Sequence, residues 1–183
     1  VEQVSDPKLK WIVKREVVRV VTPATLNLEW DIYDNFDQNT ILSLSYENNI
    51  FWLSVLDISS HKWQTCQWND FDLLQKELFK LNPKEVVLEK SLLNHEKIKE
   101  TLQKKYSLNI YYFEGVKNAR EMLLSHFWVK DFSWFWLERF PQAILASALL
   151  LNYLELHQKQ SLTYFQSLSL YGTSHFLEMD SAT

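Results

Sequence analysis

With 183 residues the chain can build one good hydrophobic core but falls short of two full domains, and its net charge of −4 argues against a module that mainly grips duplex DNA. Its single cysteine excludes an internal disulfide, its five histidines show no paired ligand spacing, and its two isolated glycines provide no phosphate-binding loop for ATP. No run of about 18 apolar residues is present, so we expect no membrane-spanning segment and no membrane partner.

Basic residues surround a β-branched run near the start of the chain. Val17 to Val21 predicts a strand, and Pro23 would end it because proline cannot donate to a sheet ladder. Three of the basic residues are candidate contacts to a DNA backbone: Lys14, Arg15 and Arg19. A solvent-exposed strand edge explains them equally well, so both interpretations stay open. The stretch from Thr22 to Gln38 is polar and acidic without a sustained period, and we expect a linker there.

Three strands are predicted next, joined by short turns. From Thr40 to Tyr46 the sequence alternates, with apolar residues on one face and Ser43 and Ser45 on the other. Ile50 to Asp57 is almost continuously apolar, as in a strand covered on both faces, and Lys62 to Trp68 alternates again. Because the connections are short, these strands should form an antiparallel meander.

Helical periodicity begins after the meander. Asn69 or Asp70 can cap a helix that Asn82 and Pro83 would stop. We expect one apolar stripe of this helix to be buried, formed by Phe71, Leu74, Leu78 and Leu81.

A strand, a helix and a second strand should follow. Glu85 to Glu89 and Asn109 to Phe113 are short apolar runs that predict strands. Between them, Ser91 should cap a helix that buries Ile98 and Leu102, four residues apart. Such a strand–helix–strand unit is expected to be parallel and right-handed.

Two more helices are predicted, from about Val116 to Phe127 and from Pro141 to about Gln158. Pro141 suits a first helical turn, where its missing N–H costs no hydrogen bond. The buried stripe of the second helix should contain Ile144, Leu145, Ala148, Leu149 and Leu156. The whole order of elements is the layout of the ribonuclease H-like fold, an α/β fold whose mixed sheet of three antiparallel strands and βαβ-type units carries helices on its faces.

Catalytic members of that fold cleave phosphodiesters with two metal ions, and one carboxylate ligand comes from the middle of the first strand. No acid lies between Thr40 and Tyr46. The nearby acids Asp57, Asp70 and Asp72 stand at a strand end and a helix start, where turn and cap roles are expected. We therefore predict no catalytic residue, no metal site and no enzyme activity for this chain.

Several motifs resemble the MutS family of DNA mismatch-repair ATPases, in that family's order and at about its spacing. They are Lys14 to Pro23, Leu56 to Ser60, Asn82 to Glu85, Ala119 with Arg120, Ala143 to Tyr153, and the closing Phe176 to Thr183. The resemblance covers the whole chain and implies a middle piece of a larger protein. It divides the chain into the end of a mismatch-recognition domain (1–22), a linker (23–38), a complete connector domain of ribonuclease H-like fold (39–158) and the start of a lever domain (159–183).

By the same resemblance the parent protein would dimerise, clamp mismatched DNA, bind ATP and magnesium in an ATPase domain outside this chain, and recruit MutL. The connector itself would need no cofactor. It would relay motion between mismatch recognition and the ATPase, as a rigid body between flexible joints at Thr22 to Gln38 and near Lys159 to Thr163. The expected location is the bacterial cytoplasm, with association to the nucleoid while on DNA.

The resemblance also implies a docking surface for MutL on the helix that begins at Ala119. Its candidate residues are Arg120, Glu121 and Met122; the family often has a polar residue in place of Met122. A helix that merely covers the sheet is the alternative. The family tends to have small residues where Trp134 and Trp136 stand here, so these indicate either a repacked loop or an aromatic patch that faces a partner.

Two other functions stay open on the sequence alone. One is a degenerate ribonuclease H-like nuclease, whose metal-dependent cleavage would require Asp57 and Asp70. The other is a nucleic-acid-binding module that uses the basic residues near the start of the chain, with Lys8 and Lys10 added to the three candidates above. Its affinity would fall steeply with salt.

Overall fold

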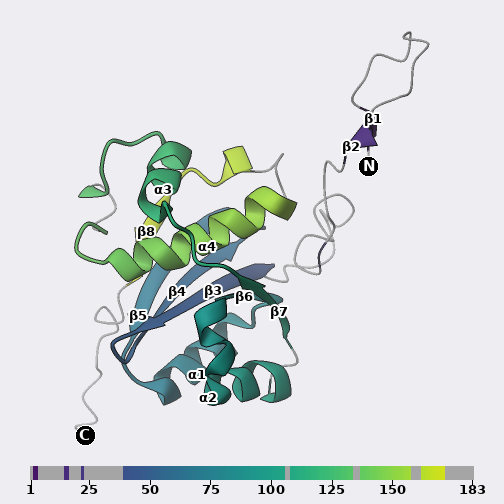
Figure 1. The fold of residues 1–183 in the computed structure, drawn as a ribbon, viewed down its shortest axis with the longest axis vertical. Helices are drawn as coiled ribbons and strands as arrows, with labels where there is room; N and C mark the ends of the chain where they lie inside the picture. Colours follow the sequence, from purple (N-terminus) through teal and green to yellow (C-terminus); the bar gives the residue numbers. More distant parts are fainter. Residues whose placement is uncertain are drawn as a thin grey trace, which may run out of the picture.

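The computed structural model of the chain describes residues 2–3, 15–16, 22, 39–105, 108–133, 137–157 and 162–171. Within these ranges a six-stranded sheet lies between two layers of helices (Figure 1). Several predictions lie outside the described residues: the strand from Val17 to Val21, the linker at 23–38, the basic candidates Lys14 and Arg19, and the closing motif at 176–183. Arg15 is described only as backbone, in the two-residue pair of β1 (Glu2–Gln3) and β2 (Arg15–Glu16).

The sheet is built around an antiparallel meander. β3 (Thr40–Glu47), β4 (Ile50–Asp57) and β5 (Lys62–Trp68) pair in sequence order, as predicted. Asn48 and Asn49 take positive φ angles of 52° and 63°, which allows the first hairpin to close in two residues.

Parallel strands extend the meander on both sides. β6 (Glu85–Glu89) pairs with β3, and β7 (Asn109–Phe113) pairs with β6, which confirms the predicted parallel arrangement. At the other edge, β8 (Leu168–Leu170) lies parallel to β5. The sequence does not predict β8, because three residues are too few to show an alternating pattern. The strand order is β7-β6-β3-β4-β5-β8, so the chain has a mixed-sheet α/β fold.

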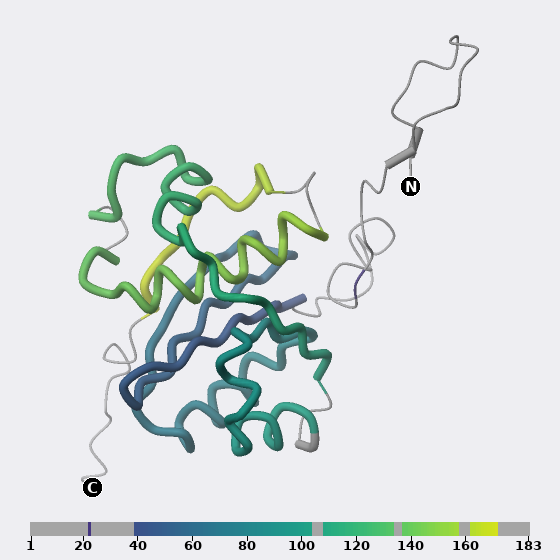
Figure 2. Tube along the Cα trace, in the orientation of Figure 1, coloured from purple at the N-terminus to yellow at the C-terminus, as the bar shows by residue number. Residues whose placement is uncertain are grey.

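Helices cover both faces of this sheet (Figure 2). α3 (Ala119–Phe127) and α4 (Pro141–His157) pack on one face. The other face is covered by α1 (Phe71–Leu81) and by α2 (Glu96–Glu100) with its neighbouring turns. The sheet therefore has a separate apolar core on each side.

The alternation predicted for β3 is confirmed by these two cores. Leu42 and Leu44 are fully buried against the α1 and α2 layer, whereas Ile41 belongs to the core under α3 and α4. The hydroxyl of Ser43 points the same way as Ile41 and donates to the carbonyl of Ala146 at 2.5 Å. A small serine here lets the helix backbone approach the sheet closely.

α4 is almost wholly apolar and is buried along most of its length. The predicted start at Pro141 is confirmed. The predicted buried stripe is wrong at Leu156, which is 56% exposed, and Leu145 is only half-buried; elsewhere the stripe is too narrow, since Ala146 and Leu150 are fully buried. A helix that is buried nearly all round has no single apolar face, so its period cannot indicate a stripe.

Local capping sets the start of α1, but not that of α2, on the opposite face. Asp70 caps α1 as predicted, and its carboxylate accepts the N–H of Asp72 at 2.8 Å. Ser91 does not cap a helix: its hydroxyl donates to Glu89 in a short 3-10 turn, and α2 begins only at Glu96. The predicted cap is wrong because Ser91 lies inside the 3-10 turn at Lys90–Asn94, and α2 starts only after that turn.

Two other helical regions depart from their predicted boundaries. Ile98 and Leu102 are buried as expected, although Leu102 lies in a π-helical turn at Thr101–Lys105 rather than in regular helix. α3 begins three residues after Val116, whose side chain packs against the core from the preceding loop. Among the described helices, none is long and apolar enough to cross a membrane.

Candidate docking surface

The three adjacent candidates on α3 lie in different environments. Leu123 and Phe127 anchor the helix in the core, and Met122 is half-buried against the same core. Arg120 and Glu121 are exposed. The helix thus covers the sheet with one face and presents a charged face to solvent, as both interpretations of this segment require.

Arg120 is tied to the loop that leads into α4. Its guanidinium donates two parallel hydrogen bonds to the carboxylate of Glu138, at 3.1 and 2.9 Å. The same carboxylate accepts the N–H of Phe132 at 2.8 Å, and the Phe132 ring lies 5.1 Å from the guanidinium carbon. Such a bidentate pair fixes orientation as well as distance.

The same hydrogen bonds shift the pKa values of the charged side chains around this loop. The Arg120 hydrogen bonds hold the pKa of Glu138 below its usual value and raise the pKa of Arg120. Hydrogen bonds from the hydroxyl and N–H of Ser133 lower the pKa of Asp131. Arg120, Glu138 and the backbone of Phe132 are therefore joined by charged hydrogen bonds.

Arg120 contacts Phe132 and Glu138, which precede and follow the two tryptophans in the sequence. Trp134 and Trp136 themselves lie outside the described residues, so the choice between a repacked loop and a partner-facing patch stays a prediction. Their described neighbour Leu137 is fully buried in the core under α3 and α4.

Trp128, which is not among the predicted candidates, is the most exposed of the large apolar residues described. It follows α3 directly, is 94% exposed, and has a left-handed backbone with φ 57° and ψ 38°. Bulky residues rarely adopt this conformation, which glycine usually supplies at the end of a helix. A tryptophan immediately after a helix, where a terminating glycine is expected, is the sequence signal that could have found it.

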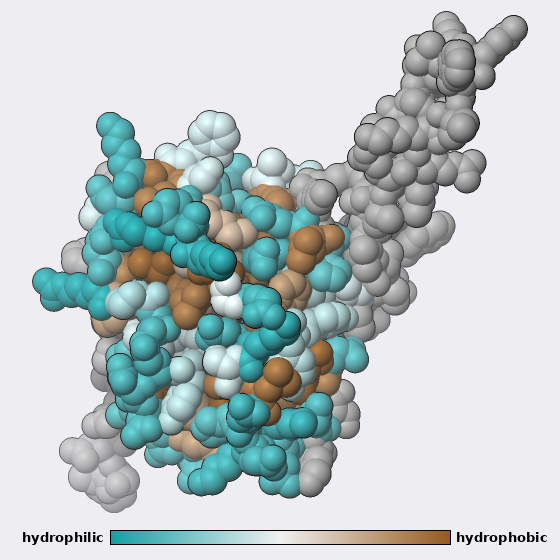
Figure 3. Space-filling view, in the orientation of Figure 1, coloured by the Kyte–Doolittle hydropathy of each residue, from teal (hydrophilic) through white to brown (hydrophobic). Residues whose placement is uncertain are grey.

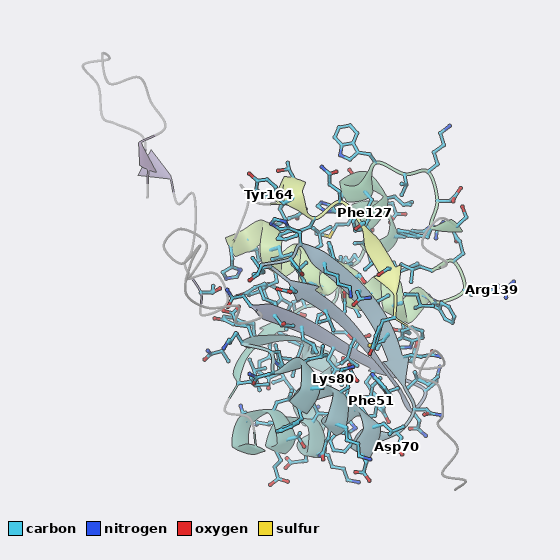
Figure 4. All side chains as sticks on the ribbon, turned by 180° about the vertical axis from the view of Figure 1, so that it is seen from behind. Phe51, Asp70, Lys80, Phe127, Arg139 and Tyr164 are labelled. Atoms are coloured by element: carbon cyan, nitrogen blue, oxygen red, sulfur yellow. The ribbon has the colours of Figure 1, made fainter. Side chains whose placement is uncertain are left out.

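A hollow of about 440 Å³ lies beside Trp128. It is lined by the end of α3 and by the segment before β8, with His126, Phe127, Leu162, Thr163, Phe165 and Gln166. Tyr164 in this segment is 63% exposed, and its ring stacks on His61 at 5.4 Å. Figure 4 shows Phe127 and Tyr164 on the same side of the sheet, away from Phe51 and Lys80. Polar side chains break up the apolar patches over the α3 and α4 layer (Figure 3).

A smaller hollow of about 280 Å³ lies on the opposite face, between α1 and strands β4 and β5. Lys80 donates to the hydroxyl of Tyr171 at 2.8 Å and lies 3.6 Å from the carboxylate of Glu77. Burial raises the pKa of the neighbouring Cys66 thiol to about 12. Basic and acidic groups neutralise each other here, so the hollow favours no ligand of one charge.

The carboxylates considered for metal chemistry have structural roles. Asp57 accepts the N–H of Ser59 at 3.0 Å and the hydroxyl of Ser60 at 2.6 Å, as the turn role predicts. Asp70 is engaged as the cap of α1. Within the ranges that the structure describes, no group of three or more histidine, cysteine, aspartate or glutamate side chains is placed to hold a metal ion.

The model of the family MutS domain II matches residues 39–166. The chain belongs to the MutS family. It is 40% identical over 187 residues to the DNA mismatch repair protein MutS of Dehalococcoides mccartyi strain 195, an alignment that covers all of this chain and 21% of that protein. It is 32% identical over 189 residues to MutS of Halothermothrix orenii, with the same coverage. The chain thus spans about a fifth of the length of the curated relatives that it matches.

Proposed function

We propose that this piece of a MutS-type protein is its connector, a non-catalytic relay between mismatch recognition and the ATPase. The match to MutS domain II carries this proposal, because it covers β3 to β7 and the four α-helices that the structure describes. By the family resemblance, the parent protein works as a dimer in the bacterial cytoplasm, joins the nucleoid while on mismatched DNA, and binds ATP and magnesium outside this chain.

The assignment of this sheet to the ribonuclease H-like fold is part of the same proposal. A central meander strand, β3, lies between an antiparallel neighbour, β4, and a parallel neighbour, β6, and β7 continues the parallel side. That arrangement supports a ribonuclease H-like sheet. The domain limits at residues 22, 38 and 158 stay proposals of the same kind.

A connector that relays motion must be stiff, and the two cores support this role. Each face of the sheet is sealed by helices, so the strands are held from both sides. Closely packed interiors transmit displacement instead of absorbing it. In this proposal the connector moves as one body.

The surface that we propose for MutL consists of Glu121 and Trp128, with Arg120 as its support. Glu121 projects from α3, and Trp128 projects from its end. Arg120 is engaged with Glu138, so it holds the adjoining loop in place. Exposed tryptophans are common energetic centres of protein interfaces. Met122 packs against the core, so it contributes mainly to the stability of α3.

A nuclease finds no support in the described carboxylates, since Asp57 and Asp70 already serve as turn and cap. The nucleic-acid-binding alternative depends on basic residues near the start of the chain, whose side chains are not described. A connector should show no metal-dependent cleavage of DNA and no tight binding to DNA at low salt.

The proposal is tested by titrating the chain with the N-terminal region of MutL. Wild type is compared with Glu121→Arg and Trp128→Gly, both at exposed positions that should leave the fold intact. Glu121→Arg is used without Met122→Arg, because an arginine at the half-buried position would disturb the core. Binding that each variant weakens at least tenfold supports the proposed surface, and Lys117→Glu on the preceding loop is the control for a general charge effect. Equal binding by all variants would rule the surface out.

A further inference from the structure

Three polar side chains from distant parts of the chain meet in the interior. Glu85 at the start of β6 and Tyr153 of α4 are both 0% exposed, and Thr22 is 4% exposed. The hydroxyl of Tyr153 donates to the carboxylate of Glu85. The side chain of Thr22 hydrogen-bonds to the phenol oxygen of Tyr153. We call these three residues the buried polar anchor.

A buried carboxyl group is costly unless its oxygens accept hydrogen bonds. Glu85 is placed there by strand pairing, since its backbone lies between Ile41 of β3 and Asn109 of β7. Burial and the adjacent Glu85 raise the pKa of Tyr153, so its phenol keeps its proton and remains a donor at neutral pH. The hydroxyl of Tyr153 thus donates its proton to Glu85. The phenol oxygen of Tyr153 can still accept a hydrogen bond from Thr22.

The ring of Tyr153 is held from several sides. His157 stacks on it with ring centroids 4.3 Å apart, and the His157 ring nitrogen Nδ1 lies 2.8 Å from the Tyr153 carbonyl. The rings of Tyr111 and Phe113 of β7 also pack against it, with ring centroids 5.1 and 6.0 Å from that of Tyr153. These contacts fix the position of the Tyr153 phenol oxygen. Thr22 must therefore occupy one defined position to hydrogen-bond to it.

We propose that the buried polar anchor is the docking site by which the preceding part of the chain is fastened to this domain. Thr22 is the occupant, and Tyr153 with Glu85 forms the socket. A flexible joint is predicted at Thr22 to Gln38, but the side chain of Thr22 is 4% exposed and hydrogen-bonds to Tyr153, so Thr22 itself would be fixed to the domain.

The anchor has a consequence for the relay, and that consequence rests on the proposed function. Tyr153 belongs to α4, which packs against α3 in the same core. A displacement of the preceding chain at Thr22 would reach the proposed docking helix through one rigid element.

Hydrogen exchange of the 183-residue chain tests the anchor. Thr22→Val and Tyr153→Phe each remove one hydroxyl and little volume. Exchange in the peptide that contains Thr22 should rise at least tenfold in both variants. In the double variant it should rise no further than in the more affected single variant, because either change breaks the same bond. Matched controls are Thr163→Val and Tyr164→Phe at exposed positions, which should change that peptide less than twofold.

Thr22→Ser keeps the hydroxyl and should retain the protection of wild type, which separates the hydrogen bond from simple packing. This comparison also stands if Tyr153→Phe fails to fold. Unchanged exchange in Thr22→Val, multiplied effects in the double variant, or equal loss in Thr22→Ser and Thr22→Val would each overturn the anchor. Because every readout uses the chain without MutL, failure of MutL docking leaves this result unaffected.

Discussion

The guanidinium of Arg120 on α3 and the carboxylate of Glu138 in the loop before α4 face each other in a bidentate pair, with hydrogen bonds of 3.1 and 2.9 Å. Glu138 also accepts the N–H of Phe132 at 2.8 Å. One carboxylate thus joins a helix, a loop and a backbone amide. Arg120, which the family resemblance marks as a docking candidate, is thus engaged with Glu138 in the structure.

Reversing Arg120 should release the loop. In Arg120→Glu the Phe132 amide should lose its protection from hydrogen exchange, because like charges would drive Glu138 away. Combining Arg120→Glu with Glu138→Arg should restore much of that protection. Arg139→Glu is the matched control, since this exposed neighbour points outward (Figure 4). Protection that persists in Arg120→Glu would show that the pair does not hold the loop.

The same pair predicts how the loop responds to acid. Arg120 lowers the pKa of Glu138, and a carboxyl with a depressed folded pKa stabilises the fold above its unfolded pKa. The protection of the Phe132 amide, corrected for intrinsic exchange, should therefore persist down to about pH 4.5, the ordinary value, and fall only as the pH drops further. In Glu138→Gln this acid step should disappear. An identical step in both proteins would assign it to another group.

Replacing Trp128 separates backbone strain from side-chain function. A non-glycine residue in the left-handed region is strained by about 1 kcal/mol, so Trp128→Gly should raise the free energy of unfolding by up to about 1 kcal/mol. Trp128→Ala removes the indole but keeps the Cβ atom, and its stability should stay near that of wild type. Denaturant unfolding of the three proteins checks this. A glycine variant less stable than the alanine variant would refute the argument from strain.

Removing the buried hydroxyl of Ser54 should lower the free energy of unfolding more than removing an exposed serine hydroxyl. It accepts the indole N–H of Trp63 at 2.7 Å and the hydroxyl of Ser147 at 3.1 Å, and all three residues are buried. Ser54→Ala leaves the Trp63 donor without this acceptor and should cost about 1–3 kcal/mol of unfolding free energy. Ser167→Ala, at an exposed position, should change it by less than about 0.5 kcal/mol. Equal effects in thermal or denaturant unfolding would contradict the role of the buried bond.

Because the Cys66 thiol is buried, the free energy of unfolding should fall at alkaline pH. Its pKa is raised by burial from 9.0 to about 12, so the thiol ionises more readily in the unfolded chain. The stabilising effect is complete below pH 9 and is lost as the pH rises toward 12, by about 1.4 kcal/mol per pH unit. Unfolding of wild type and Cys66→Ala between pH 8 and 10.5 isolates this slope from those of other groups. Parallel pH profiles would show that the thiol is not responsible.

Local sequence patterns predict much of this fold. The alternation around Ser43, the short turns between the meander strands, the Asp70 cap and Pro141 at a helix start all act through residues close in sequence, and the structure bears them out. The stripe of α4 and the cap at Ser91 could not be predicted. The stripe depends on burial on all sides of α4, and the cap depends on the 3-10 turn at Lys90–Asn94, which delays the start of α2 to Glu96.

The candidate site was less accessible to prediction than the fold. Family resemblance marks Arg120, but it does not indicate that Glu138, eighteen residues later, would bind it. The meeting of Thr22, Glu85 and Tyr153 spans more than a hundred residues and has no local signature. Side-chain pairs of this kind are decided by the packing of whole elements, after strand order and helix placement are set.

The central claim, that α3 and its end form the MutL docking surface of a connector, is tested most directly by a footprint. Hydrogen exchange of the chain would be measured with and without the N-terminal region of MutL. Our account predicts new protection in Ala119–Phe127 and in the segment from Trp128 to Asp131, with little change in α1. Protection confined to α1 and the hollow beside Lys80, or no protection anywhere in a folded chain, would contradict it.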